Sequence, residues 1–225
     1  MHANTLIVPG LGNSGPAHWQ TWLEGQLPEA RRVRHIDWSA PTLARWAHEL
    51  RREIDHMGGR VWLVAHSFGC LASVVAAADR PDRVAGLLLV APPDPTRFDA
   101  VGLRPASAWG QPGGLDGLIP ATPFGVPSLL VASQSDPWAS FACSEAWARA
   151  WGSQLVDLGD AGHINVDSGH GPWPEGLALL EQFRQDQAVG GEAGAALPAR
   201  TAHRGRGGVL ARLRHQTRSL ARGRA

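Results

Sequence analysis

VWLVAHSFG, at Val61–Gly69, is the stretch that decides the fold of this chain. Its first five residues, 61–65, are all apolar, which is typical of a strand buried on both faces in a parallel sheet. The residues that follow it, 70–78, are small and mostly apolar and predict a buried helix. A sharp turn from strand to helix is therefore expected at Ser67.

The turn is similar to the nucleophile elbow G-x-S-x-G, in which a strained turn presents a reactive serine. Such a turn needs small residues two positions before and two after the serine, and this chain has Ala65 and Gly69 there. Ala65 replaces the usual glycine, and a methyl group is tolerable at that position. The alternative is an ordinary turn in which Ser67 caps the helix. Cys70 is expected to be a buried structural thiol, and His66 to point away from the nucleophile.

Short apolar runs and helical patterns alternate along the rest of the chain. The further expected strands are residues 5–8, 33–37, 84–91, 128–132 and 155–158, and the further expected helices are residues 16–27, 42–57, 140–151 and 174–187. This alternation predicts an α/β fold, a three-layer sandwich with a mostly parallel central sheet. Residues 92–125 hold seven of the 17 prolines, and we expect them to be irregular and to form a short cap or lid.

Charge divides the chain into two parts. Residues 1–187 carry 13 Arg and 19 acidic residues, a net charge of −6, whereas residues 188–225 carry 8 Arg and one acidic residue, a net charge of +7. Residues 1–187 are expected to form one domain, since they are long enough for a single sizeable core. Residues 188–225 are rich in Gly, Ala and Arg and predict a disordered tail. Only this tail suits nucleic acid, which is not an expected partner of the domain.

Two residue types are absent from the sequence, and their absence narrows the chemistry. All 21 basic residues are Arg, and the chain has no Tyr. Without Lys, the sequence excludes Ser-Lys dyads, Schiff bases and the phosphate-binding lysine of a P-loop. Proton transfer must therefore come from His, Asp, Glu or Cys.

No cofactor and no metal is expected, because no set of residues completes a ligand pattern. The two cysteines, Cys70 and Cys143, do not indicate a disulfide framework. No apolar run approaches the roughly 18 residues that a membrane span requires. The first residues lack the basic start of a secretory signal. A cytoplasmic protein without a membrane span is therefore expected.

A base and an acid that would activate Ser67 follow it in the chain. In α/β-hydrolase folds the order is serine, then Asp or Glu, then His. Asp136 comes just after the predicted strand 128–132, and His163 lies in a glycine-flanked loop after the strand 155–158. Both therefore fall at strand ends, where active sites of parallel sheets assemble. Asp160 is the alternative carboxylate and His170 the alternative base.

The glycine-rich loop Gly10–Gly15 allows two interpretations. In a hydrolase, the backbone N–H groups of Leu11 and Phe68 are the candidates for an oxyanion hole. The same loop also fits the dinucleotide-binding pattern G-x-G-x-x-G, with Asp37 22 residues past Gly15 as the acid for the ribose. The absence of Lys and Tyr disfavours a nicotinamide reductase of the short-chain type. The order of Ser67, Asp136 and His163 favours the hydrolase.

Five stretches of the chain resemble the small serine hydrolases of the retinoblastoma-binding protein 9 / YdeN family, a compact branch of the α/β hydrolases. They are VPGLGNSGPAHWQTWLE, WSAPTLARWAHEL, LVAHSFGCLAS, ASQSDPWASF and LGDAGHINVDSGHGPWPEG, which occur in this order between residues 4 and 185. The resemblance implies a compact α/β-hydrolase fold with a minimal cap. It also implies Ser67, Asp136 and His163 as a catalytic triad.

The activity that the resemblance implies is carboxylesterase-like hydrolysis of a small ester or related acyl substrate. The residues expected in the substrate pocket are Gly12, Asn13, His18 and Trp138. An NAD(P)-dependent oxidoreductase and a weakly active or non-catalytic binding protein are the alternatives. Binding to retinoblastoma protein through L-x-C-x-E is not expected, because the nearest string, Phe141–Glu145, lacks the leucine.

Overall fold

Six parallel strands form the central sheet in the computed structural model, which describes residues 4–195. The strands are β1 (Thr5–Val8), β2 (Ala30–Arg32), β3 (Val61–His66), β4 (Val84–Val90), β7 (Ser128–Ala132) and β8 (Gln154–Asp157). Their order across the sheet is β2-β1-β3-β4-β7-β8. Because every pair is parallel, the carboxyl ends of all six strands meet at one edge.

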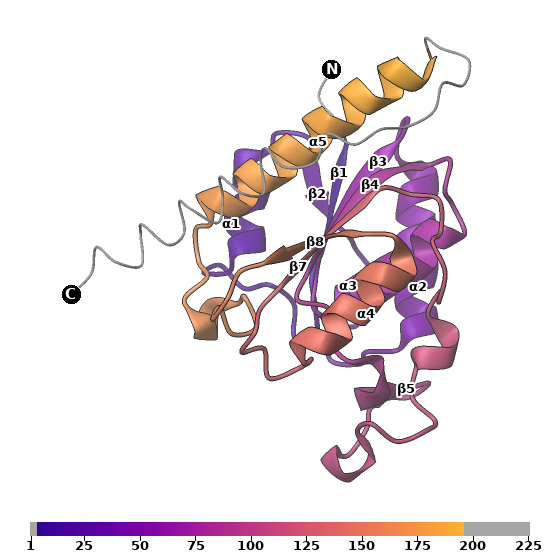
Figure 1. The fold of residues 1–225 in the computed structure, drawn as a ribbon, viewed down its shortest axis with the longest axis vertical. Coiled ribbons are helices and arrows are strands. Elements are labelled where there is room, and N and C mark those ends of the chain that lie inside the picture. The colour runs from indigo at the N-terminus through magenta and orange to yellow at the C-terminus, as the bar shows by residue number, and fades with distance from the viewer. Residues whose placement is uncertain (1–3, 196–225) are drawn as a thin grey trace, which may run out of the picture. The chain divides into compact units, whose positions relative to one another are not determined.

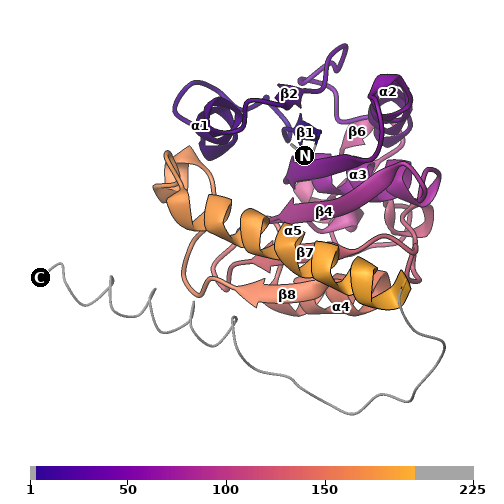
Figure 2. The ribbon, with the colours of Figure 1, turned by 90° about the horizontal axis from the view of Figure 1, so that it is seen from above.

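Helices cover both faces of this sheet. They are α1 (Trp19–Gln26), α2 (Leu43–His56), α3 (Phe68–Ala78), α4 (Phe141–Trp151) and α5 (Pro174–Ala195). Figure 1 shows α2, α3 and α4 on one face and α1 with α5 on the other, and Figure 2 shows the same layers from above. The predicted α/β fold with a mostly parallel sheet is confirmed.

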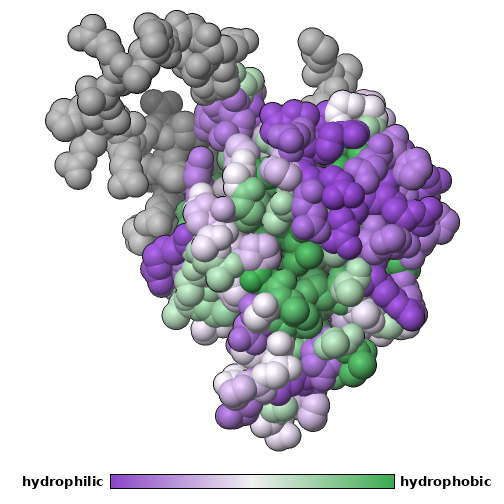
Figure 3. Space-filling model, turned by 90° about the vertical axis from the view of Figure 1, so that its right-hand side faces the viewer, coloured by the Kyte–Doolittle hydropathy of each residue, from purple (hydrophilic) through white to green (hydrophobic). Residues whose placement is uncertain are grey.

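The core has two layers because successive side chains along each strand point to opposite faces of the sheet. Leu6 and Val8 of β1 belong to the apolar cluster that α2 and α3 cover, and Ile7 between them points to the opposite face. On α2 the buried residues recur at helical spacing, with Trp46 and Leu50 at most 1% exposed. Figure 3 shows the face that carries α2, α3 and α4, with hydrophobic side chains at its middle and hydrophilic ones around them.

Three predicted elements differ from those observed. The helix expected over residues 16–27 is α1, Trp19–Gln26, which begins three residues later because His18 caps it. The second strand is Ala30–Arg32, and the prediction of residues 33–37 was wrong. Val33 still donates its N–H to the carbonyl of Ile7, but His35 has a left-handed backbone with φ of +63°, which ends the extended segment. Helix α5 continues to Ala195, past the predicted end at residue 187, because no proline interrupts the chain before Pro198.

The segment 92–125 is largely irregular, as expected. It contains three single turns of 3₁₀ helix and a two-stranded antiparallel ladder of β5 (Phe98–Asp99) and β6 (Gly102–Leu103). In Figure 1 the segment lies at the bottom, below α3 and α4. Phe98 is its buried anchor, 1% exposed, with its ring 4.8 Å from that of Phe68. The segment therefore reaches the first residue of α3, next to Ser67.

The chain divides into two units, Met1–Gln185 and Asp186–Ala225, and helix α5 runs from the first into the second. The sheet and the site described below belong to the first unit. Most of the predicted tail, residues 196–225, lies outside the described residues. In the part of the chain that the structure describes, none of the helices combines the length and apolar character needed to cross a bilayer.

Candidate active site

Ser67 occupies a strained turn between β3 and α3. Its φ of +53° and ψ of −129° are unusual for a residue with a side chain, and its hydroxyl makes no capping bond to the helix. Gly69 is required here, because a Cβ atom on it would lie 2.4 Å from the carbonyl oxygen of Pro9. Ala65 is fully buried in the core cluster, which accommodates its methyl group. The turn therefore has the geometry of a nucleophile elbow.

The loops that follow β7 and β8 are tied to one another. Ser133, after β7, donates its hydroxyl to the carbonyl of Gly159 at 3.1 Å and accepts the N–H of Ala161 at 3.0 Å. Ser135 accepts the N–H of Gly162 at 3.0 Å. These bonds place Asp136 and His163, which lie at the ends of the two loops, side by side at the carboxyl edge of the sheet.

Ser67, His163 and Asp136 form a hydrogen-bonded row. The Nε2 atom of His163 lies 2.9 Å from the Oγ of Ser67, and its Nδ1 lies 2.9 and 3.0 Å from the two carboxylate oxygens of Asp136. A carboxylate only accepts hydrogen bonds, so Nδ1 carries the proton and Nε2 faces the hydroxyl as an acceptor. Ser67 and His163 are 9% and 7% exposed. Asp136 also accepts the N–H of Trp138 at 2.8 Å, which fixes its carboxylate.

The alternative acid and base have other partners. The carboxylate of Asp160 accepts the hydroxyl of Ser135, on the outer side of the loop. His170 contacts Ser168 through Nδ1, and its ring lies edge-on to Trp173 at 5.8 Å. Within residues 4–195, His163 is the imidazole that reaches Ser67.

The glycine-rich loop lies directly against the serine. A Cβ atom on Gly10 would lie 2.7 Å from the Cβ of Ser67 and 3.2 Å from its Oγ. The N–H of Gly12 is used, since it donates to the carbonyl of Trp38 at 2.8 Å. By contrast, the N–H groups of Leu11 and Phe68 donate to no acceptor within the described residues. Two unused donors thus lie on the two segments that meet at Ser67.

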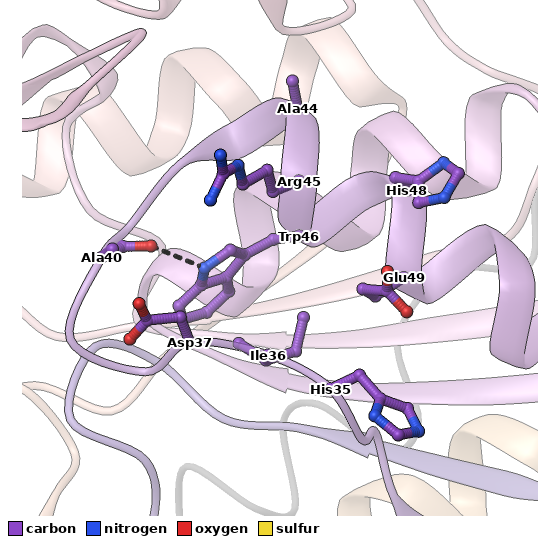
Figure 4. Close-up of a pocket in the computed structure, with 9 residues that line it drawn as sticks. All are labelled: His35, Ile36, Asp37, Ala40, Ala44, Arg45, Trp46, His48 and Glu49. Carbon is purple, nitrogen blue, oxygen red and sulfur yellow. Dashed lines mark hydrogen bonds between the residues drawn. The ribbon is translucent and has the colours of Figure 1, made fainter.

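The dinucleotide interpretation of this loop has no support in the geometry. It requires the N-terminus of α1 to receive a pyrophosphate, but the ring of His18 caps that end, with Nδ1 3.1 Å from the N–H of Gln20. Asp37 instead lines a cavity of about 480 Å³ between the loop after β2 and helix α2 (Figure 4). None of the residues 10–15 lines that cavity.

Comparison with known proteins shows the family to which this chain belongs. Residues 5–182 match the serine hydrolase family. The chain belongs to that family. A search of curated proteins found no match to this hydrolase.

Solved structures show which members of the family this chain is similar to. This hydrolase is 38% identical to a putative YdeN-like hydrolase from Pectobacterium atrosepticum, over 83% of its own length and 92% of the other chain, with a TM-score of 0.73. The ydeN gene product from B. subtilis is 21% identical over 80% and 98% of the two chains, with a TM-score of 0.64. Est1E from Butyrivibrio proteoclasticus, with ferulic acid bound, shares the fold at 16% identity, 83% and 88% coverage and a TM-score of 0.59. The expected resemblance to YdeN-like α/β hydrolases is confirmed.

The residues expected to form the substrate pocket differ in how directly they contact the row of Ser67, His163 and Asp136. The ring of Trp138 is 5.9 Å from that of His163 and 6.3 Å from that of Phe98 in the segment 92–125. Gly12 and Asn13 are exposed and left-handed, with φ of +80° and +66°. His18 is only 6% exposed. Trp138 is thus the pocket candidate with a measured contact to the row.

Burial keeps the other imidazoles near the row uncharged. It lowers the pKa of His18 to about 4, and the charge of Arg32 acts in the same direction. It also lowers the pKa of His66 well below 6.5, with smaller effects from His163 and His18. The pKa of His170 is lowered mainly by burial. A proton taken up by His163 therefore meets no neighbouring imidazolium at neutral pH.

Both cysteines are unsuited to act as nucleophiles. Cys70 is fully buried, donates to the carbonyl of Val90 at 3.4 Å, and has its pKa raised well above 9 by burial. Burial raises the pKa of Cys143 to about 11. The described residues also contain no group of three or more His, Cys, Asp or Glu side chains placed to hold a metal ion.

Three buried residues that contact the site or the strands beneath it escaped the sequence analysis in whole or in part. His66 and Trp19 donate to the backbone of the His163 loop, at 2.9 Å in both cases. Gln20, fully buried, donates to the carbonyl of Val8 at the end of β1 and to that of Val64 within β3. Most of these contacts join residues that are far apart in the sequence, and none of the donors belongs to a recognisable local motif. The sequence carries no signal for them beyond the family resemblance of residues 8–24 and 63–73.

Proposed function

We propose that this hydrolase cleaves small carboxylic esters through an acyl-enzyme intermediate on Ser67. One observation carries the proposal: the His163 ring bonds the Ser67 hydroxyl on one side and the Asp136 carboxylate on the other, each at 2.9 Å. A serine hydroxyl is a weak nucleophile without such a base, and an oriented base needs such an acid. Membership in the serine hydrolase family supports the same chemistry.

In the first step, the Oγ of Ser67 forms a bond to the carbonyl carbon of the ester while His163 Nε2 takes the hydroxyl proton. The carbonyl oxygen becomes an oxyanion. His163 then returns the proton to the alcohol oxygen as the bond between carbon and that oxygen breaks. The alcohol leaves, and the acyl group stays on Ser67.

In the second step, water attacks the acyl carbon, and His163 Nε2 takes its proton. The bond to Ser67 breaks, Ser67 Oγ recovers a proton from His163, and the carboxylic acid is released. Asp136 stays ionised throughout. It holds the Nδ1–H form of the ring and stabilises the imidazolium that forms in each step.

The N–H groups of Leu11 and Phe68 are the proposed oxyanion donors. Both lack a protein acceptor within the described residues, and the Gly10 contact brings their segments together at Ser67. Loss of one such donor typically costs about 2.7–4 kcal/mol of transition-state stabilisation. Gly12 is excluded from this role because its N–H already binds Trp38.

The proposed acyl pocket lies between the Trp138 side of the row and the loop that carries Gly12 and Asn13, with His18 behind it. The segment 92–125 would act as a minimal cap, since Phe98 packs against both Phe68 and Trp138. A cap this short favours small acyl groups. Residues 4–185 would then form one catalytic domain.

A panel of p-nitrophenyl esters of increasing acyl length tests the proposal. We expect hydrolysis by the wild type, with losses of up to about 10⁶-fold in Ser67→Ala and His163→Ala. The double variant should be little worse than either single one, because the residues act as a unit. Wild-type rates in Ser67→Ala, or no ester hydrolysis by folded wild type, would contradict the proposal.

A further inference from the structure

Two buried N–H groups hold the backbone of the loop that carries His163. The Nε2 of His66 lies 2.9 Å from the carbonyl oxygen of His163. The indole Nε1 of Trp19 lies 2.9 Å from the carbonyl oxygen of the next residue, Ile164. A carbonyl oxygen only accepts, so His66 carries its proton on Nε2. Both donors are well buried, His66 at 5% and Trp19 at 1% exposure.

The loop needs these bonds because its backbone is strained. Ile164 has a φ of +49°, which is costly for a β-branched side chain, and Gly162 on the other side of His163 has a φ of +56°. Such conformations persist only where the surroundings over-determine them. Here the restraint comes from two consecutive carbonyls, each bound by a donor from a different part of the fold: the end of β3 and the start of α1.

Ring contacts fix the donors themselves. The ring of His66 lies 4.9 Å from that of His163 and 4.9 Å from that of His18, and Trp19 meets His66 edge-on at 6.0 Å. His66 also directly precedes Ser67 in the elbow. One residue thus links the position of the nucleophile to that of the base.

We propose that His66 and Trp19 are positioning residues of the acyl-transfer reaction, which hold His163 Nε2 within hydrogen-bonding distance of Ser67 Oγ. They touch neither the substrate nor the reacting atoms. The inference rests on the proposed function, since it gives these residues a role in the same reaction. It also explains why the start of α1 approaches a site formed at the ends of β3, β7 and β8.

The charge state of His66 is consistent with this role. Burial lowers its pKa well below 6.5, and the rings that face it, His163 and His18, act in the same direction together with His170. His66 therefore stays neutral, with its proton committed to the His163 carbonyl, and does not act as a second base. Its removal should alter the position of His163 without removing a charged group from the site.

The test compares Trp19→Phe and His66→Leu with wild type. Trp19→Phe retains an aromatic ring but removes the N–H donor together with part of the buried indole, and His66→Leu removes the other donor. We expect kcat for a p-nitrophenyl ester to fall by about 10²-fold in each, the usual effect of a misplaced catalytic group. KM and the pKa from the pH profile of kcat/KM should not change. His66→Gln, which retains a terminal N–H, should recover most of the lost kcat.

Trp62→Phe is the matched control. Trp62 is also a buried tryptophan, 6% exposed, but its ring packs against Phe183. Its kcat should equal that of wild type. Urea denaturation of every variant separates loss of folded protein from loss of rate. If His66→Leu does not fold, Trp19→Phe decides alone.

The outcomes separate the inference from the proposed function. If Ser67→Ala and His163→Ala abolish hydrolysis while folded Trp19→Phe and His66→Leu keep wild-type kcat, the positioning role is wrong and the triad stands. A rise in KM or a shifted kinetic pKa without a fall in kcat would also overturn it. If Ser67→Ala hydrolyses esters normally, the proposed function fails and the inference fails with it.

Discussion

The carboxyl edge of β3, β7 and β8 holds its polar groups differently from the outer face of β2 and α2. At the first, Ser67, Asp136 and His163 are nearly buried and joined by short bonds. At the second, the Arg52 side chain that pairs with Glu49 is 53% exposed, and the Arg34 side chain that pairs with the buried Glu53 is 69% exposed. The second region also contains the 480 Å³ cavity. Charged side chains and a cavity are therefore not confined to the surroundings of Ser67, Asp136 and His163.

The difference lies in what each environment does to a polar group. Exposed ion pairs are screened by water and contribute little, typically 0–1 kcal/mol. A buried polar group must be bonded, so its partners fix its position and its protonation. Substitutions at the first region should therefore change the reaction strongly, and those at the second should change little.

The largest effect among the variants that test this contrast is expected for Asp136→Asn. The amide cannot hold His163 in the required Nδ1–H form, and kcat for ester hydrolysis should fall by about 10⁴-fold with the fold unchanged. Asp160→Asn is the control, because that carboxylate binds Ser135 and not the imidazole. A larger loss in Asp160→Asn than in Asp136→Asn would reverse the assignment of the acid.

Gly10→Ala should have the next largest effect. Its Cβ would lie 2.7 Å from the Cβ of Ser67, so that the loop and its oxyanion donor must move. We expect kcat to fall by about 10²–10³-fold, as when an oxyanion donor is lost. Gly15→Ala is the matched control, since nothing lies within 4 Å of a Cβ there. The dinucleotide interpretation predicts instead that both glycines matter and that the protein binds NAD(P), which a fluorescence titration would detect.

A smaller effect concerns stability against acid. The pKa of His18 is lowered to about 4 in the folded protein, whereas an unfolded histidine titrates near 6.5. As the pH falls below about 6.5 the unfolded chain takes up this proton first, so the free energy of unfolding should decrease from about pH 6.5 down to about pH 4.

Urea denaturation at pH 7 and pH 4.5 measures this loss. His18→Asn keeps a side-chain acceptor at the start of α1 and removes the titration, so its stability should fall less than that of wild type over the same interval. His48→Asn, at an exposed position on α2, should behave as wild type. An identical decrease in all three proteins would refute the assignment to His18.

The smallest effect is expected on the outer face of α2. Arg52→Ala removes a 2.7 Å ion pair with Glu49 between positions i and i+3 of the helix. The free energy of unfolding should change by no more than about 0.5 kcal/mol, and ester hydrolysis should be unchanged. A tenfold or greater loss of activity would mean that this face of α2 takes part in the reaction, and the contrast between the regions would fail.

Much of the fold followed from local sequence. The buried strand 61–65, the small residues of α3 and the periodicity of α2 each determine an element by themselves. The β2 strand was misplaced because the left-handed backbone of His35 leaves no mark in a run of polar and β-branched residues. The extent of α5 was underestimated, since composition alone placed its end too early.

The three residues of the candidate site could be predicted from their order in the chain and from their positions at the ends of strands. Ser67, Asp136 and His163 each follow a strand, and parallel strands bring their carboxyl ends together. The groups that hold them could not be predicted in the same way. His66 and Trp19 bind the His163 loop across 97 and 145 residues of sequence, and such contacts depend on packing that no local pattern encodes.

Covalent labelling with a fluorophosphonate probe tests the central claim most directly. The probe reacts with an activated serine, and mass spectrometry of the intact protein followed by peptide mapping locates the adduct. The account predicts one equivalent of probe on Ser67, much slower labelling in His163→Ala and none in Ser67→Ala. Folded wild-type protein that stays unlabelled, or an adduct that persists in Ser67→Ala, would contradict it.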